Sequence, residues 1–229
     1  KTIYIVDLTN NSATAKNNLG EEIKALKKPM AGKDENLYYL NGNKIVQFNS
    51  KTEEVKILAI NSAGHLNDIS AAADYNNRLY LLNSKDGQIY RYNKRPDGFA
   101  DEAPSLKKEE DFSEAVDMAI DGSIYVLKKN SEILKFFKGS KEEEFKISAI
   151  DPGLENASRI FVSPEKNYIY ILEPAKQRLV LFDKTGKFIL QYKSDRFTDL
   201  KDFTVDESKK IIYFLNGKSV YEIEAKELK

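Results

Sequence analysis

One short strand pattern recurs five times along the chain, and its spacing limits the folds that the chain can adopt. Each copy has an aliphatic residue, then a Tyr, then two further residues that are apolar or aromatic. The copies begin at positions 37, 79, 124, 169 and 212, so successive copies are 42 to 45 residues apart. A period in the low forties is typical of a β-propeller, in which each repeat supplies one blade of four short strands.

The most regular repeat shows all four strands of such a blade. They are residues 159–162, 168–172, 178–182 and 187–192, and residues that favour turns, such as Pro164 and Gly186, separate them. Antiparallel neighbours can be joined by connections of this length. The sequence therefore predicts an all-β fold, a β-propeller of four-stranded antiparallel blades.

The repeat also predicts how the chain is divided. The blade cores are expected at residues 29–60, 68–104, 115–148, 158–192 and 202–224, with the last completed by residues 2–16. We therefore predict a single domain over residues 1–229 with five blades, closed by pairing of residues 3–7 with the last repeat near residues 220–223. The alternative is part of a six- or seven-bladed ring, but an open ring would expose unpaired strand edges.

Composition excludes several classes of function. Lys plus Arg and Asp plus Glu both number 36, so no net charge selects a nucleic acid, and we expect none as a partner. The chain has no Cys, which excludes disulfides, thiolate metal sites and a Cys nucleophile. No apolar run approaches the roughly 18 residues of a membrane span, so we expect no membrane insertion in this segment. The chain begins inside a strand pattern without Met, which we interpret as an excised domain or a processed product.

The innermost strand of four of the five blades has a charged residue at its start. Asp68, Asp117, Arg159 and Asp202 are expected to occupy one equivalent position, with Pro29 at the corresponding place in the first repeat. Strands of one type begin on the same face of every blade. The sequence therefore predicts that the four charged residues surround one mouth of the central channel, with His65 and Asn67 of the preceding loop on its rim.

Three carboxylates and one guanidinium favour a small polar ligand or a loop of a protein partner at this mouth. Two other interpretations remain open. Each Asp could bond to neighbouring backbone N–H groups, or the carboxylates could hold Ca²⁺, which prefers oxygen ligands. Arg159 would repel a cation, so we expect no cofactor and no metal site. His65 has no Gly-x-Ser-x-Gly turn or second His beside it in the sequence, so we interpret it as a loop residue and predict no catalytic residues.

Two segments depart from the repeat. Residues 94–114 contain Pro104 and a charge cluster, so the outer strand of that blade is weak; we interpret the segment as a solvated insertion or a binding loop. The charge run at residues 141–144 is typical of an exposed strand edge that is kept soluble.

Residues 178–183 and 186–188, preceded by residues 168–171, resemble the NHL-type repeat and its lactonase-like propeller relatives. Residues 117–126 and 201–214 are similar to the inner half of that repeat. The family usually has an Asp after its Tyr strand. This chain departs from that pattern with Asn41, Asn83, Lys128, Glu173 and Asn216.

The resemblance implies a non-catalytic sensor or recognition module that binds a protein or a small ligand, such as the ectodomain of a larger membrane-anchored signalling protein. An extracytoplasmic or cell-surface location follows from that hypothesis, with a cytoplasmic location as the alternative. The second functional hypothesis is a lactonase-like hydrolase that depends on a divalent metal in the central channel.

Overall fold

The computed structural model describes residues 1–228, and the chain divides into two compact units, Lys1–Asp111 and Phe112–Lys229. Within the described residues, regular secondary structure consists of strands apart from one 3₁₀ turn, Pro174–Lys176. None of the described segments forms a helix with the length and apolarity needed to cross a bilayer.

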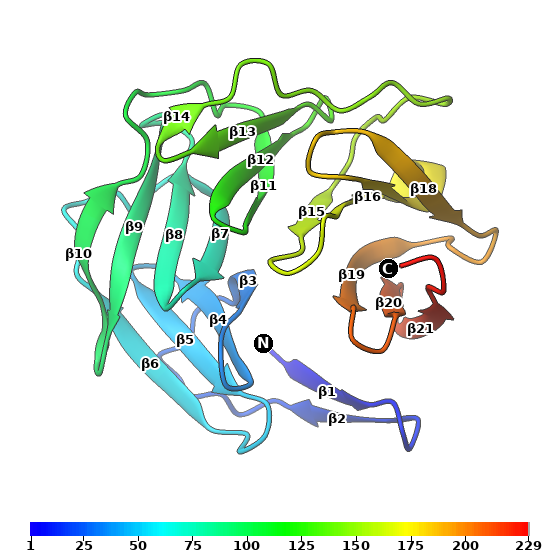
Figure 1. Ribbon diagram of the computed structural model, residues 1–229. Coiled ribbons are helices and arrows are strands. Elements are labelled where there is room, and N and C mark those ends of the chain that lie inside the picture. The colour runs from blue at the N-terminus through cyan, green and yellow to red at the C-terminus, as the bar shows by residue number, and fades with distance from the viewer. Residues whose placement is uncertain (229) are drawn as a thin grey trace. The chain divides into compact units, whose positions relative to one another are not determined.

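The N-terminal unit contains a hairpin and two blades (Figure 1). The hairpin is β1 (Ile3–Asp7) and β2 (Ser12–Lys16). The first blade is β3 (Lys27–Ala31), β4 (Asn36–Asn41), β5 (Lys44–Asn49) and β6 (Val55–Ile60). The second blade is β7 (Ile69–Tyr75), β8 (Arg78–Asn83), β9 (Gln88–Arg95) and β10 (Gly98–Pro104).

The outer strands of these two blades pair with each other, so the blades form one eight-stranded sheet (Figure 1). The link is short and parallel, with Gly98 opposite Ala59 and Phe99 opposite Ile60. Gly98 has φ +153°, and a Cβ at this position would lie 2.1 Å from the carbonyl oxygen of Ala59. Only glycine lets the two backbones approach this closely.

The C-terminal unit contains three further sheets (Figure 1). The third blade is β11 (Ala115–Ile120), β12 (Ser123–Lys128), β13 (Ile133–Phe137) and β14 (Ser140–Lys141). The fourth is β15 (Arg159–Val162), β16 (Ile169–Glu173), β17 (Arg178–Phe182) and β18 (Phe188–Lys193). The last sheet is β19 (Leu200–Asp206), β20 (Ile211–Asn216) and β21 (Ser219–Glu224).

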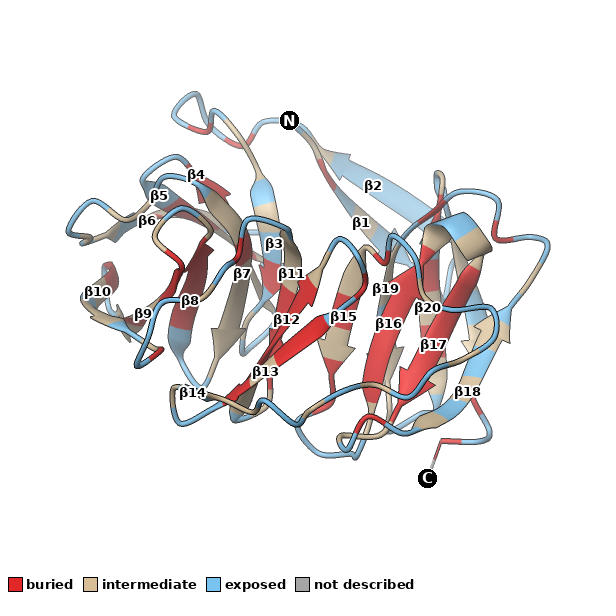
Figure 2. Ribbon diagram, turned by 90° about the horizontal axis from the view of Figure 1, so that it is seen from above, coloured by how far each residue is buried: buried red, intermediate tan, exposed pale blue. Residues whose placement is uncertain are grey.

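The recurring Tyr occupies an equivalent place in every blade, as predicted. It pairs with the same position of the following strand each time: Tyr38 with Gln47, Tyr80 with Arg91, Tyr125 with Lys135, Tyr170 with Leu181 and Tyr213 with Glu222. The first four Tyr are buried and Tyr213 is half-buried. Strands β16 and β17 are buried along their whole length (Figure 2), so the core of the C-terminal unit is built on them.

The predicted fold class, an all-β chain of four-stranded antiparallel blades, is confirmed. The interpretation of residues 94–114 as a solvated insertion was wrong for part of that segment. Residues 98–104 form the outer strand β10, and Phe99, Leu106 and Phe112 are buried. Apolar side chains spaced between the charges carry this segment into the core. The number of blades in the ring and its closure by residues 3–7 stay predictions.

Four of the five polar residues that follow the Tyr strand have a common structural role. The side-chain Oδ1 of Asn41 accepts the backbone N–H groups of Lys24 and Ala25, and the side-chain Oδ1 of Asn216 accepts that of Asp199. In the same way the Asn83 amide donates to the carbonyl of His65, and the Glu173 carboxylate accepts the N–H of Glu155. Each therefore ties the loop before an inner strand to its own blade. Lys128 is the exception, and its Nζ lies 3.8 Å from Glu132.

Candidate functional site

Three of the predicted site residues occupy one equivalent position in the C-terminal unit. Each lies opposite the Leu that follows the recurring Tyr by two residues: Asp117 opposite Leu127, Arg159 opposite Leu172 and Asp202 opposite Leu215. The inner strands β11 and β15 pack against each other in this unit. The sequence therefore predicted the equivalence of these three residues correctly.

The side chain of Asp117 connects two inner strands. Its Oδ2 accepts the backbone N–H of Ile160 in β15 at 3.0 Å. Burial raises the pKa of the Asp117 carboxyl to about 6, although the Ile160 N–H group and the Arg159 charge act in the opposite direction. The arrangement matches the interpretation in which the Asp bonds to a neighbouring backbone group.

Arg159 continues the same series. Its Nε lies 3.4 Å from Oδ1 of Asp202, and both side chains are partly exposed, 35% and 41% respectively. Asp202 Oδ1 also accepts the backbone N–H of Phe203. A charged side chain at this position therefore reaches from one inner strand to the next. These contacts explain why the position holds charged residues, and no bound ligand is needed for that explanation.

Asp68 does not occupy the equivalent position, so that part of the prediction was wrong. In the second blade the residue opposite Leu82, two after Tyr80, is Ala71. Asp68 lies outside β7 with φ +56°, and its carbonyl oxygen accepts the N–H of Ser84. The pairing of β7 with β8 shifts register before Ala71 as the corresponding pairings do before Asp117 and Asp202, so Asp68 lies three residues ahead of the equivalent position. The connection from the inner strand to the Tyr strand has two residues in the second blade and four in the last, and a strand pattern does not show this difference.

His65 is held by a polar cluster at the outer strands of the second blade. Its Nδ1 lies 2.7 Å from Glu102 of β10, and its ring stacks on Tyr90 with centroids 4.1 Å apart. The same carboxylate accepts the Tyr92 hydroxyl at 2.6 Å and the Ser62 hydroxyl at 2.5 Å. These hydroxyl donors and His65 hold the pKa of Glu102 below its usual value, although burial acts in the opposite direction.

This cluster has the parts of a catalytic triad in the wrong arrangement. Ser62 and His65 share Glu102 as acceptor, whereas nucleophile activation requires the His to accept the hydroxyl proton. The Ser62 oxygen also accepts the backbone N–H groups of Gly64 and His65. The cluster fixes the loop onto β9 and β10, as expected of a loop residue. Asn67 is exposed in this loop, and its predicted place on the channel rim, with that of His65, stays a prediction.

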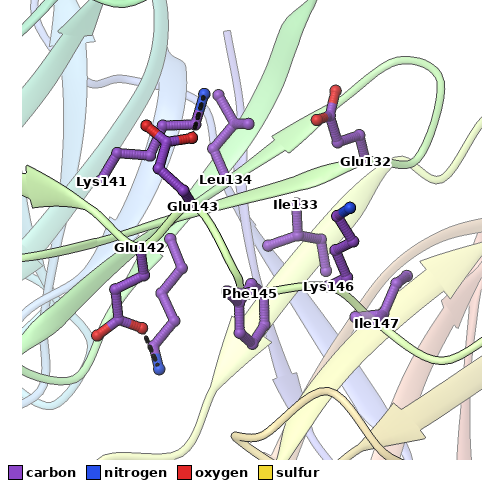
Figure 3. Close-up of a pocket in the computed structure, with 10 residues that line it drawn as sticks. Glu132, Ile133, Leu134, Lys141, Glu142, Glu143, Phe145, Lys146 and Ile147 are labelled. Atoms are coloured by element: carbon purple, nitrogen blue, oxygen red, sulfur yellow. Dashed lines mark ion pairs between the residues drawn. The ribbon is translucent and has the colours of Figure 1, made fainter.

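A groove that the sequence analysis missed lies at the outer edge of the third blade (Figure 3). Its volume is 520 Å³, within the range of ligand sites. Residues 132–135 line one side and residues 141–143 and 145–147 the other. We call residues 142–147 the strap. The groove exists because β14 ends at Lys141, so the strap leaves β13 instead of completing a full outer strand.

The groove has an apolar centre and charged ends. Ile133, Phe145 and Ile147 supply the apolar surface (Figure 3). Lys135 crosses it, with its Nζ 5.0 Å from the Phe145 ring centroid and 2.7 Å from Glu142. A cation above an aromatic ring and beside a carboxylate is stabilised by both. Lys141 and Glu143 form a second ion pair at 3.8 Å.

One sequence signal lay at the groove but was interpreted differently. The charge run at residues 141–144 was taken as an exposed strand edge. Glu143 and Glu144 are indeed exposed, but only the first residue of the run lies in a strand. Three successive Glu disfavour strand pairing. The run therefore marked the place where the outer strand stops.

Among residues 1–228, no group of three or more His, Cys, Asp or Glu side chains is arranged to hold a metal ion. The carboxylates proposed for a channel metal have other interactions: Asp117 with the Ile160 N–H group and Asp202 with Arg159.

No protein-family model matches the chain, and no curated protein sequence matches it. Solved structures do match. Virginiamycin B lyase from Staphylococcus aureus is 14% identical, with 97% of this chain and 76% of that chain covered, at a TM-score of 0.54. Glutaminyl cyclase from Myxococcus xanthus is 11% identical, with 86% and 88% covered, at 0.58. A nidogen/laminin complex contains a chain that is 8% identical, with 84% and 72% covered, at 0.58.

These neighbours are β-propellers, so the comparisons agree with the blades seen here and show that the chain has a β-propeller fold. At such low identity the likeness shows the fold alone. Enzymes and a protein complex occur together among the neighbours, as expected for a fold that carries many functions.

Proposed function

We propose that this chain is a non-catalytic recognition module that binds a polypeptide partner in the groove of the third blade. The observation that carries the proposal is the groove itself, a 520 Å³ depression beside a strand whose outer neighbour stops after two residues. Its apolar centre would contribute binding free energy through burial, and its charged ends would orient a partner.

Two further observations support binding rather than catalysis. The Ser, Glu and His of the second blade are not arranged to activate a nucleophile. The carboxylates suggested for a lactonase-like metal site interact with a backbone N–H group or with Arg159. A propeller neighbour in a nidogen/laminin complex supports protein binding as a role that this fold can perform.

Selection of peptides from a random display library on the immobilised chain tests the proposal. We expect selected peptides to lose at least tenfold in affinity for a Phe145→Ala variant, because Phe145 forms an apolar wall of the groove. Phe137→Ala is the matched control: Phe137 lies at the end of β13, is 47% exposed and does not line the groove. Failure to select any peptide would overturn the proposal, as would equal binding to both variants.

The inner-strand pair of Arg159 and Asp202 is a second candidate surface. Both side chains are partly exposed, and their separation of 3.4 Å leaves hydrogen-bonding capacity for a polar ligand. The same peptides can be measured against an Arg159→Ala, Asp202→Ala double variant. Binding that is lost in this variant and retained in Phe145→Ala would move the site from the groove to the inner strands.

A further inference from the structure

The groove of the third blade is the space of a missing strand. We infer that an extended segment of a partner protein occupies this space and completes the blade by pairing antiparallel with β13. The inference rests on the proposed function, and it specifies how the partner binds and what chemistry its segment has. Addition of a strand to a sheet edge is a common mode of peptide recognition.

Backbone groups of β13 face the groove. The carbonyl of Lys135 accepts the N–H of Glu142, so the backbone N–H and C=O groups of Lys135 face the outer edge of the sheet. Along an antiparallel strand, the backbone N–H and C=O groups of successive residues face opposite edges of the strand. The N–H of Lys135 and both backbone groups of Ile133 therefore face the same edge. The strand ladder on that side covers only Phe136 and Phe137.

The strap does not fill the space because its end is fixed elsewhere. The N–H of Ser148 donates to the carbonyl of Gly186 at 2.7 Å, and the Ser148 hydroxyl accepts the N–H of Phe188 at 2.8 Å. A Cβ on Gly186 would lie 2.1 Å from the carbonyl oxygen of Lys146, so the contact with the fourth blade is close. Beyond Glu142, the strap is therefore bound to the next blade and held away from β13.

The fourth blade shows what a complete outer strand looks like. There the third strand has Leu179 opposite Tyr192, Val180 opposite Gln191 and Leu181 opposite Leu190. The shared Tyr register makes Ile133, Leu134 and Lys135 the equivalents of these three residues of β17. A guest strand would therefore place one residue opposite each of them, and its residue opposite Lys135 would replace Glu142, whose N–H bonds to the Lys135 carbonyl in the free chain.

The walls of the groove define the side chains of the guest. Residues opposite Ile133 and Lys135 would face the apolar surface of Phe145 and Ile147. The residue between them would point to the other face. In β18 the same alternation is seen, with half-buried Leu190 and Tyr192 flanking exposed Gln191. The guest is thus an alternating segment with two apolar residues around a polar one, and charged groups of the groove can pair with charges at its ends.

A synthetic peptide with the sequence of residues 187–193, Lys-Phe-Ile-Leu-Gln-Tyr-Lys, is the probe. We expect it to bind the full chain and to slow amide exchange at Ile133 and Lys135. N-methylation at its Tyr removes an N–H that would donate to Ile133, and we expect at least tenfold weaker binding. N-methylation at its Gln is the matched control, because that N–H faces away from β13, and affinity should change less than threefold.

The outcomes separate the inference from the proposed function. Library peptides that need Phe145 but tolerate either N-methyl group would overturn strand addition and leave groove binding intact. A probe peptide that fails to bind, or that binds with no added protection of Ile133 and Lys135, would also overturn the inference. Protection of these amides without any peptide, by dimerisation at high concentration or by the strap, would show that the chain completes its own blade and would equally overturn it.

Discussion

The third and fourth blades both have an ion pair where the second strand turns into the third, but the pair is buried in one blade and exposed in the other. In the fourth blade Glu173 ends the second strand and Arg178 begins the third; Nε of Arg178 lies 2.5 Å from Oε2 of Glu173, and both side chains are buried. In the third blade the equivalent pair is Lys128 and Glu132, with the charges exchanged, 3.8 Å apart and 52% exposed at Glu132. The outer strand is complete beside the buried pair and stops after two residues beside the exposed pair.

The difference teaches that burial, not the presence of an ion pair, decides what the pair does. Arg178 also donates to Gln191 of β18 and to the carbonyls of Pro152 and Gly153. It therefore connects the outer strand and the incoming loop to the centre of the blade. The exposed pair makes no comparable connection among the described contacts, and water competes for its charges.

Arg178→Ala is the strongest test of this comparison. It would leave Glu173 charged and buried without its partner, so we expect the free energy of unfolding to fall by about 3–5 kcal/mol. Glu132→Ala, the matched change in the third blade, should lower it by less than about 1 kcal/mol. Urea denaturation measures both. Similar losses in the two variants would show that the blades do not differ as described.

Gly186→Ala tests the contact that holds the strap. Gly186 has φ +91°, and a Cβ would meet the Lys146 carbonyl, so we expect a loss of about 2–3 kcal/mol. Gly42→Ala is the control, because Gly42 has φ +63° with open space around it and should cost only about 1 kcal/mol. Thermal denaturation gives both values. Equal costs would mean that the strap yields easily and that its contact is weak.

The pH dependence of stability tests the link between the inner strands of the two blades. Burial raises the pKa of Asp117 to about 6, so the folded chain keeps this proton to a higher pH than the unfolded chain does. The stability that this group contributes is full below about pH 4 and is lost as the pH rises through about 6. Asp117→Asn keeps an acceptor for Ile160 and does not titrate. Relative to the original chain, the Asn variant should gain on the order of 2 kcal/mol between pH 4 and pH 7.

Denaturation of both proteins at the two pH values provides the measurement. A difference in stability that stays constant from pH 4 to pH 7 would show that Asp117 is not perturbed by its place between β11 and β15.

The smallest effect is expected at the groove itself. Glu142→Gln removes the charge beside Lys135, whose ammonium group also lies over Phe145 and Tyr125. Because Glu142 is 38% exposed, the loss of stability should be about 0.5 kcal/mol or less. A loss above about 2 kcal/mol would mean that the groove is a structural part of the blade rather than a surface free to bind.

The fold could be predicted because the signal for it is periodic. The Tyr at 38, 80, 125, 170 and 213 repeats at blade spacing, and its pairing register is the same in every blade. The alternation of apolar and polar residues along a strand indicates which of its faces is buried. This pattern can be recognised within a few consecutive residues. Closure of the ring by residues 3–7 depends on pairing of the two chain ends and stays a prediction. Deletion of residues 1–8 followed by urea denaturation addresses it.

The candidate site could be predicted only in part. Asp117, Arg159 and Asp202 were found because three inner strands share a register, whereas Asp68 lies three residues before the equivalent position, which Ala71 occupies. The connection between the inner strand and the Tyr strand differs in length between blades, two residues in the second and four in the last, and an apolar pattern does not encode that difference. The groove was missed because it results from the absence of a strand. The fixed end of the strap depends on Gly186, 38 positions after Ser148 in the sequence.

The eight-stranded sheet of the N-terminal unit has a consequence during synthesis of the chain. Strand β6 ends at Ile60, and its parallel partner begins at Gly98, roughly forty residues later. At about 5–20 residues per second, translation of that interval takes on the order of 2–8 s. Throughout this time the outer edge of β6 lacks its partner strand β10, which has not yet been synthesised. The nascent first blade is therefore open to pairing with another chain until the second blade has emerged, and the Gly98 contact ends that exposure.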